Sequence, residues 1–395
     1  MNKPHRSSSF MQRAIRQAFT GWGARFGAFW VAVLVILAVF SPLIANTVPL
    51  MVSEQGQITL PFLRYITVED AIVMGAFITL LSLYFLPIQK IFKTRIGYFI
   101  VMMIAITLMA NGLIKPPELI IYDDFRLKEN KQTYDWVIKA PVPYSPLDYL
   151  RDSSEYPLQA PLAEGEHLHL MGTEENGADV LSRMIHASRV ALGIGFLATG
   201  IAMFIGTILG GLMGYFSGII DMLGMRLVEI FEAIPTLFLL LTFVAFFGRN
   251  IYLIMIIIGL TSWSGYTRYA RAEFLKLRKQ DYVQATIASG LPLRSILFRH
   301  MLPNGVAPLL VSASFGVASA ILAEAVLSFL GLGPVEAASW GQMLDQSVKA
   351  STFNWWMAVF PGGAIFLTVF SYNLMGEALR DAIDPQMSKK AGVAG

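Results

Sequence analysis

Long runs of apolar residues recur along the chain and alternate with shorter polar stretches. A helix needs about 20 apolar residues to cross the hydrocarbon core of a bilayer, and eight runs reach or approach that length. Pro42 lies at the end of the first run and no clean cleavage site follows it, so we interpret that run as a retained anchor. The predicted spans are Phe26–Ala45, Ala71–Ile88, Ile96–Ile114, Ala191–Phe216, Met225–Phe247, Ile251–Ala270, Val306–Leu330 and Trp355–Met375.

The order of these runs predicts the fold class and the division of the chain. We expect an all-α integral membrane protein with about eight transmembrane helices, three before a long polar region and five after it. The polar region is rich in proline, which predicts a mostly irregular lid. The predicted parts are a cytoplasmic N-terminal segment (1–25), three N-terminal transmembrane helices (26–114), an extracytoplasmic loop region (115–187), a five-helix core (188–381) and a cytoplasmic tail (382–395).

The composition supports this prediction and excludes several other classes. Hydrophobic residues make up 55% of the chain and charged residues 14%, whereas a soluble protein carries about 25% charged residues. These figures exclude a disordered chain and a collagen-like chain. The absence of cysteine excludes a disulfide scaffold. The net charge of +3 is too small to indicate an acidic partner, and no nucleic acid is expected to bind.

The distribution of Lys and Arg predicts the orientation of the spans. Cytoplasmic loops carry an excess of basic residues, and most of the 30 Lys and Arg lie near the two termini and in the segments 90–95 and 268–299. This bias places both termini in the cytoplasm and predicts a multi-pass protein of the inner (cytoplasmic) cell membrane.

No set of catalytic or metal-binding residues is recognisable. The sequence has no GxSxG elbow, no phosphate loop ending in Lys-Ser/Thr and no HExxH motif, so the chain is not expected to hydrolyse ATP. His167 and His169 lie close to Glu164 and Glu166, but the helical spacing of a metal-binding pair is absent, and a surface loop is the favoured interpretation. We therefore predict no catalytic residue, no metal and no cofactor.

Ionisable residues inside predicted spans are functional hypotheses, because an uncompensated charge is unfavourable in a membrane. Glu229 and Glu324 are the candidates for a transport pathway or for helix packing. Arg226 precedes Glu229 by three residues, so a local ion pair is the alternative for that carboxylate. For Glu324, a pore-facing role and a role between helices stay open.

Small residues predict a close helix contact, and prolines predict interruptions. Gly206, Gly210 and Gly214 recur at four-residue spacing, a pattern that lets two helices approach closely, either within this chain or with a partner. Pro235 and Pro361 are expected to break or kink their spans, which is tolerated where neighbouring helices or water satisfy the freed backbone groups.

The cytoplasmic segment 271–304 is polar, yet too regular to be a linker. A short helix is predicted before Gly290, which is placed to end it in a left-handed conformation. A second short helix is expected at 293–299, and Pro303 is expected to stop it before the next span. Two short helices at the membrane surface are typical of a docking element, although such a loop, taken alone, is more often structural than functional.

This segment resembles the EAA loop of ABC-importer permeases, in which Glu-Ala-Ala is followed at fixed spacing by Gly and then by Leu-Pro. Gln284 replaces the Glu and Thr286 replaces the second Ala, whereas the later residues fall in register. The resemblance identifies an ATPase-coupling loop with the residues Tyr282, Gln284, Ala285, Thr286, Gly290, His300, Leu302 and Pro303.

Three further segments are similar to the peptide-transporting branch of that family. Residues 171–183 resemble GTDxxGRDVLSR, with Ala178 where arginine is usual, while 324–333 and 378–385 resemble EAxLSFLGLG and ALRDALDP. Together the four ordered matches identify the chain as a member of the C-type permease subunits of dipeptide/oligopeptide importers. The start of the first outer loop is similar to the microcin C and oligopeptide subfamily.

The resemblance implies a type I ABC-importer permease domain over 188–381 that moves di-/oligopeptides or modified peptides inward. It also implies partners, namely a second permease subunit, two ABC ATPase subunits, an extracytoplasmic peptide-binding protein, the peptide substrate and the lipid bilayer. The usual subunit has six spans, so the predicted spans 71–88 and 96–114 are additional.

Two other classes remain alternatives at the level of sequence. A secondary transporter or channel works without ATPases, and it calls for charged relays or repeated halves, which are not clear here. A membrane-bound enzyme calls for acids or histidines paired at the interface. The one cluster to consider comprises Glu174, Glu175, Asp179 and His186.

Overall fold

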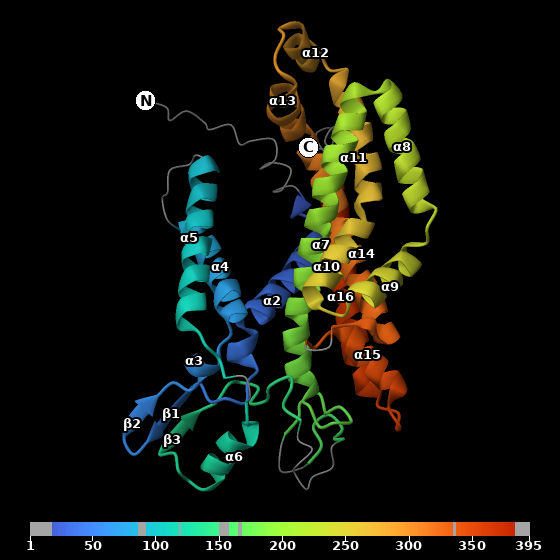
Figure 1. The fold of residues 1–395 in the computed structure, drawn as a ribbon. Coiled ribbons are helices and arrows are strands. Elements are labelled where there is room, and N and C mark those ends of the chain that lie inside the picture. The colour runs from blue at the N-terminus through green and yellow to red at the C-terminus, as the bar shows by residue number, and fades with distance from the viewer. Residues whose placement is uncertain are drawn as a thin grey trace. The chain divides into compact units, whose positions relative to one another are not determined.

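The computed structural model describes residues 18–85, 92–117, 120–149, 158–164, 168–334 and 337–383 (Figure 1). The chain forms two compact units. The first, here called the core unit, comprises Met1–Val33, Val190–Asp345 and Pro361–Gly395, and the second, the cap unit, comprises Leu34–Arg189 and Gln346–Phe360. Four helices contribute residues to both units: α2 (Trp22–Ile44), α7 (Val180–Phe216), α15 (Trp340–Lys349) and α16 (Trp355–Ile383).

The rest of the core unit is helical. In chain order its elements are α8 (Gly218–Glu232), α9 (Thr236–Phe247), α10 (Ile251–Thr261), α11 (Trp263–Arg278), α12 (Asp281–Ala288), α13 (Leu293–Ser295), η2 (Ile296–Met301), α14 (Leu302–Leu327) and η3 (Ser328–Leu332). Helices α12 and α13 lie together at one end of the core unit, beyond the ends of the long helices (Figure 1).

The predicted span 225–247 is not one straight helix. Helices α8 and α9 meet at an angle of 76°, and Pro235 lies directly before the first residue of α9. Proline has no N–H group, so it is tolerated at the start of a helix but interrupts its interior. The predicted break at Pro235 is confirmed, whereas α16 continues through Pro361 as one helix.

The predicted span 251–270 is also divided, at Ser262. The side chain of Asn250 caps α10 by accepting two backbone N–H groups of its first turn. The hydroxyl group of Thr261 then donates to carbonyls of the preceding turn, and α11 begins after Ser262. With only 11 residues, α10 is too short to cross a membrane by itself. Among the described residues, six other helices are long and apolar enough to do so, or seven spans result if α8 and α9 together form one.

One contiguous hydrophobic cluster holds α7, α9, α10 and α14 together. Ile194, Ile254 and Leu327 are completely buried in it. Lipid tails are as apolar as these side chains, so removing the side chains from lipid gives no hydrophobic gain. Dispersion contacts between the closely packed helices stabilise the arrangement instead. The buried members are Val190, Ile194, Ala198, Leu240, Val244, Ile254, Met255, Ile257, Ile258, Ala320 and Leu327.

The cap unit contains a small antiparallel sheet of order β2-β1-β3, formed by β1 (Met51–Glu54), β2 (Gln57–Thr59) and β3 (Trp136–Ile138). Gln55 and Gly56 connect β1 to β2 with positive φ angles of 53° and 76°, as expected for a two-residue hairpin turn. Beside the sheet are α3 (Phe62–Tyr65) and α6 (Tyr122–Asn130). Residues 122–130 and 136–138 are thus regular, whereas the other described residues between 115 and 170 form neither helix nor strand, so this region is mostly irregular, as expected.

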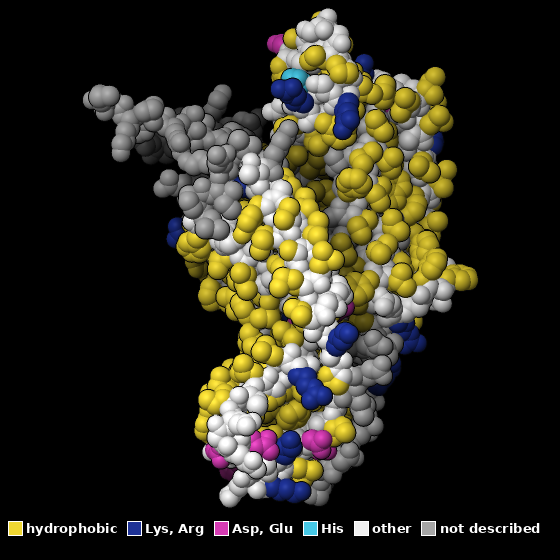
Figure 2. Space-filling view, turned by 60° about the vertical axis from the view of Figure 1, so that its left-hand side comes forward, with side chains coloured by type: hydrophobic (Ala, Val, Ile, Leu, Met, Phe, Trp, Pro, Cys, Tyr) yellow, Lys and Arg dark blue, Asp and Glu magenta, His cyan; other side chains and the backbone are white. Residues whose placement is uncertain are grey.

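The remaining helices of the cap unit are α4 (Val68–Phe85) and α5 (Phe92–Leu113), which pack on each other. Of the 18-residue apolar stretches of these two helices, only 11% and 6% of the residues are buried inside the protein. Their apolar surfaces therefore suit contact with lipid. Figure 2 shows hydrophobic side chains covering most of the surface over the long helices on one face of the molecule, with few Lys and Arg among them.

Candidate functional site

The segment 271–304, here called the hairpin, comprises the end of α11, the short helices α12, α13 and η2, and the start of α14. Val283 on α12 is completely buried, and so is Met301 at the end of η2. These side chains pack against α11, so one face of α12 is fixed to the neighbouring helices while the other remains exposed. The buried cluster comprises Phe274, Leu277, Val283, Ile296, Leu297 and Met301.

Gly290 ends α12 in the left-handed conformation, with a φ angle of 69°. The N–H of Gly290 donates to the carbonyl of Ile287 at 3.0 Å, and the N–H of Leu291 donates to that of Thr286 at 3.3 Å. This pair of bonds is the Schellman motif. A Cβ atom on Gly290 would meet nothing within 4 Å, so the backbone angle, not lack of space, requires glycine here. The predicted left-handed cap is confirmed.

The side chains predicted to contact an ATPase lie on α12. Tyr282 is 39% exposed, and its hydroxyl group is hydrogen-bonded to Asn304 in the first turn of α14. Partial burial and the nearby Glu273 carboxylate raise the pKa of Tyr282, with the Asn304 bond opposing them, so the phenol is neutral at physiological pH. Gln284 is exposed and donates to the carbonyl of Arg278 at 2.7 Å.

Ala285 is also exposed on α12, whereas the hydroxyl group of Thr286 bonds within the helix, to the carbonyl of Val283 at 2.7 Å. The Gln284 side chain, which stands where the family has Glu, therefore braces the turn between α11 and α12. The structure places the predicted coupling residues of α12 on one short helix, with Tyr282, Gln284 and Ala285 open to a partner.

The second half of the hairpin differs from the prediction at Pro303. Helix η2 continues directly into α14, and Pro303 lies in the first turn of α14. Proline is tolerated there because its missing N–H is not needed at a helix start, so Pro303 does not stop the preceding helix as expected. The carbonyl of His300 accepts a bond from Asn304 at 2.7 Å, and Leu302 packs on the edge of the buried cluster.

Ion pairs that the sequence analysis missed connect α11 to α8. Arg271 binds Asp221 through two hydrogen bonds, one of 2.6 Å between Nη2 and Oδ2, and Arg268 pairs with Glu232. Nothing in the sequence marks these pairs, because the partners are far apart along the chain and only the crossing of the two helices joins them.

Arg278, at the end of α11, holds the turn between α7 and α8. Its Nη1 atom donates to the hydroxyl group of Ser217 at 2.7 Å, and its guanidinium group lies 5.8 Å from the ring centre of Tyr215. Ser217 has a positive φ angle of 53°, a conformation that non-glycine residues adopt rarely. The start of the hairpin is thereby tied to the α7–α8 turn.

The three glycines at four-residue spacing face α11. A Cβ atom on Gly206 would lie 2.8 Å from the backbone nitrogen of Thr267, and one on Gly214 would lie 2.6 Å from the carbonyl oxygen of Arg271. On Gly210 it would lie 2.8 Å from the backbone nitrogen of Arg271. The helix that these glycines approach is therefore part of this chain.

The two membrane carboxylates have different surroundings. Glu229 pairs with Arg226 at 2.5 Å on an exposed surface, which is the local ion pair of the alternative interpretation. Glu324 is 2% exposed, and its Oε1 atom accepts a hydrogen bond of 2.5 Å from Ser328, with Ser339 as a second partner. Glu324 thus joins α14 to the segment before α15, which corresponds to the inter-helix role.

Of the acidic and histidine residues considered for a metal site or an enzyme, His169, Glu174 and Asp179 are buried and paired within the protein, and His186 contacts the carbonyl of Ala45. His169 is 1% exposed and its Nδ1 atom lies 2.8 Å from Asp179, so the surface-loop interpretation is wrong for His169, while His167 lies outside the described residues. Glu174 forms a buried ion pair with Arg183. The described residues contain no group of three side chains placed to bind a metal.

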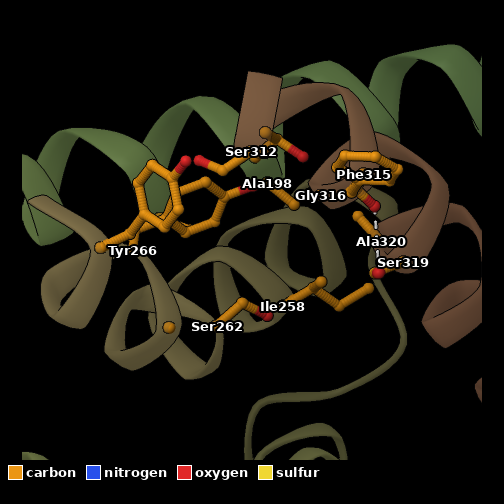
Figure 3. A pocket seen from close by; sticks show the side chains of 13 residues that line it. Ala198, Ile258, Ser262, Tyr266, Ser312, Phe315, Gly316, Ser319 and Ala320 are labelled. Atoms are coloured by element: carbon orange, nitrogen blue, oxygen red, sulfur yellow. Dashed lines mark hydrogen bonds between the residues drawn. The ribbon is translucent and has the colours of Figure 1, made fainter. Parts of the chain in front are cut away.

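A cavity of about 290 Å³ opens between α7, the α10–α11 break and α14 (Figure 3). Its lining carries hydroxyl groups, including those of Tyr266, Ser312 and Ser319, and has no charged side chain. A Cβ atom on Gly316 would overlap the Tyr266 hydroxyl group, so glycine makes room for that ring. This cavity could not be predicted from the sequence, because serine and tyrosine in an apolar helix have no pattern of their own.

The described helices, six of which are long and apolar enough to cross a membrane, define a multi-pass membrane protein. The sequence matches the family described as "Binding-protein-dependent transport system inner membrane component" over residues 206–389. The chain belongs to this family and, within it, to the dipeptide/oligopeptide ABC permeases. It is therefore a multi-pass protein of the inner membrane.

Three named relatives illustrate the similarity. The chain is 40% identical over 228 residues, 58% of this chain and 73% of the relative, to the oligopeptide transport system permease protein OppC of Haemophilus influenzae. It is 37% identical over 231 residues, 58% and 75% of the two chains, to the dipeptide transport system permease protein DppC of Alkalihalophilus pseudofirmus. It is 38% identical over 253 residues, 63% and 82%, to the di/tripeptide transport system permease protein DppC of Pseudomonas aeruginosa.

A solved structure of the MetNI methionine ABC transporter in an inward-facing conformation also aligns with the chain. The alignment covers 52% of this chain and 98% of the other, with 16% sequence identity and a TM-score of 0.43.

Proposed function

We propose that the chain is the permease subunit of an ATP-binding-cassette importer that moves di- or oligopeptides, or modified peptides, across the cytoplasmic membrane. The observation that carries this proposal is the hairpin, in which Val283 anchors α12 while Tyr282 and Gln284 remain accessible. The names of its relatives, which are oligopeptide and dipeptide permeases, support the class of substrate.

In this proposal ATP is hydrolysed by separate subunits, and α12 receives their motion. The Schellman cap at Gly290 and the Tyr282–Asn304 bond fix α12 to its return segment, so that a push on α12 moves the hairpin as one body. The Arg271–Asp221 pair and the glycine contacts then carry the motion from α11 to α8 and α7. The coupling residues proposed are Tyr282, Gln284, Ala285, Thr286, Gly290, His300, Leu302 and Pro303.

The proposed assembly contains a second permease subunit, two ABC ATPase subunits and an extracytoplasmic binding protein that delivers the peptide. The permease domain is proposed to extend over 188–381, with both termini in the cytoplasm. In this proposal the hairpin is cytoplasmic as well, because cytoplasmic loops carry an excess of basic residues and the segment 268–299 is rich in them.

Reconstitution into lipid vesicles tests the proposal. Vesicles that contain all four transmembrane and ATPase subunits should take up a labelled peptide only when ATP and the loaded binding protein are both supplied. A secondary transporter or channel predicts the opposite result, namely uptake by this chain alone along an ion or peptide gradient without the ATPases. Such uptake contradicts the proposed function.

A further inference from the structure

Two hydroxyl groups in the cavity of Figure 3 are buried and lack partners beyond each other. Tyr266 is 8% exposed and Thr199 is 6% exposed. The part of the chain that the structure describes offers neither hydroxyl group a hydrogen bond outside this pair. Buried polar groups in native proteins are nearly always bonded to protein or to a ligand or water. The pair therefore indicates a polar occupant of the cavity.

Other hydroxyl groups of the cavity lining behave differently. Ser312 donates to the carbonyl of Leu309 at 2.9 Å, and Ser319 donates to that of Phe315 at 3.0 Å. Their protons are used within α14, so their oxygen atoms can still accept hydrogen bonds from an occupant. The cavity thus presents hydroxyl donors from α7 and α11 and acceptor oxygens from α14.

The backbone around the cavity is shaped to keep it open. Helix α10 ends and α11 begins at Ser262, which lines the cavity. On the opposite side, Gly316 leaves the space that the Tyr266 ring enters. A side chain on Gly316 would displace Tyr266, so the position of the phenol depends on a glycine of another helix.

The chemistry of the lining selects the class of ligand. No Asp, Glu, Lys, Arg or His lines the cavity, so it offers no counter-ion to a charged group. Hydroxyl groups both donate and accept, as amide N–H and C=O groups require. The volume of about 290 Å³ is at the lower end of ligand pockets, which begin at about 300 Å³, so the cavity fits a segment of a peptide rather than a whole oligopeptide.

We propose that this cavity is a subsite of the transport pathway that holds an uncharged stretch of peptide backbone through Tyr266 and Thr199. The inference rests on the proposed function, and it names the residues that would contact the cargo. Recognition of the amide groups alone explains how one subsite accepts peptides that differ in their side chains.

The test uses the reconstituted four-subunit complex with its binding protein and two labelled cargoes, trialanine and trilysine. In Tyr266→Phe and in Thr199→Val the hydroxyl group is removed while the shape is kept. Each variant should lower kcat/KM for the loaded binding protein about five-fold, the effect of one lost hydrogen bond, and equally for both peptides.

Ser314→Ala is the matched control, because Ser314 lies on α14, donates to the carbonyl of Leu310 within that helix and is not part of the cavity lining. It should transport both peptides at the wild-type rate. The inference fails if Tyr266→Phe and Thr199→Val both leave kcat/KM unchanged, or if they affect only one of the two peptides. If the wild-type complex takes up neither peptide, the proposed function itself has failed. A variant that does not assemble is replaced by the other one, since either hydroxyl group is sufficient for the test.

Discussion

Arg271 on α11 binds Asp221 on α8 through two of its guanidinium nitrogens, with 2.6 Å between Nη2 and Oδ2. Their side chains are 29% and 16% exposed, so solvent only partly screens the pair. A paired guanidinium and carboxylate define both the distance and the angle between two helices. This contact connects the helix that enters the hairpin to the bent α8–α9 segment.

The Arg271–Asp221 pair can be tested by a double-mutant cycle. Arg271→Ala and Asp221→Ala should each destabilise the protein, and the double variant should be more stable than the sum predicts, by about 0.5–3 kcal/mol. Unfolding in detergent measures the free energies. Strictly additive effects of the two substitutions contradict a direct interaction.

Replacement of Gly290 should uncouple ATP hydrolysis from transport. Its φ angle of 69° is costly for residues with a branched Cβ, by about 1–2 kcal/mol, so Gly290→Val should distort the end of α12 and abolish peptide uptake. Gly290→Asn should retain most of the uptake, because asparagine tolerates the left-handed region. ATP-driven uptake in vesicles is the measurement.

Gly248 provides the control for backbone strain. It also has a positive φ angle, 92°, with open space around its Cβ position, but it lies at the end of α9 and outside the hairpin. Gly248→Val should therefore lower stability at least as much, because a φ of 92° with a ψ of 179° is essentially restricted to glycine, while the folded complex still takes up peptide. Equal loss of peptide uptake in both variants argues against a specific role for the Gly290 turn.

The glycine stripe predicts opposite effects of the same substitution on one helix. Gly210→Ala should destabilise the protein by about 1–3 kcal/mol, because its Cβ atom would lie 2.8 Å from the Cβ of Ala270 and from the backbone nitrogen of Arg271. Gly200→Ala on the same helix meets nothing within 4 Å and should be neutral or stabilising by up to about 1 kcal/mol. The free energies of unfolding of the two variants can be measured in detergent. If Gly200→Ala proves less stable than Gly210→Ala, the packing described for α7 is wrong.

The spans, the Pro235 break and the Gly290 cap could be predicted because each depends on local sequence. Apolar runs of about 20 residues and a proline or glycine at a helix end carry their own physical signal. The break at Ser262 had no such signal, because the sequence around it contains no proline and the polar residues there can also occur inside a helix. The effect of Pro303 was mispredicted, since a proline in the first turn of one helix does not require the preceding helix to end.

The candidate site could be predicted only in part, because some of its features depend on local sequence and others depend on how the helices cross. The positions of Tyr282, Gln284 and Gly290 in the loop could be predicted, because they follow the spacing of the family pattern. The partners of Arg271, Glu324 and Tyr266 depend on which helices cross, and no spacing within one helix encodes that. The sheet of the cap unit was missed because β1 and β3 are only 4 and 3 residues long and are separated by two long helices.

The β1–β2 turn of the cap unit should weaken in acid. The backbone N–H of Gly56 and the hydroxyl group of Ser53 both donate to Asp135 and lower its pKa. A lowered pKa means that the carboxylate stabilises the fold fully above its unfolded pKa of about 3.9 and loses this effect as the pH falls through the folded value. Protection of the Gly56 amide from hydrogen exchange, corrected for intrinsic rates, should fall below pH 4 in the wild type, and Asp135→Asn should remove this pH dependence.

The most direct test of the central claim uses the absence of cysteine from the chain. A single cysteine at exposed Gln284 should form a disulfide or a short crosslink with an ATPase subunit in membranes, and the same substitution at buried Val283 should not. Ile58, which is 65% exposed on β2, supplies the control for the opposite membrane face. We predict that only Gln284→Cys is captured by the ATPase, whereas only Ile58→Cys reacts with an impermeant maleimide added outside. Labelling of Gln284→Cys from outside, or no crosslink in an assembled complex, would contradict the proposed role of the hairpin.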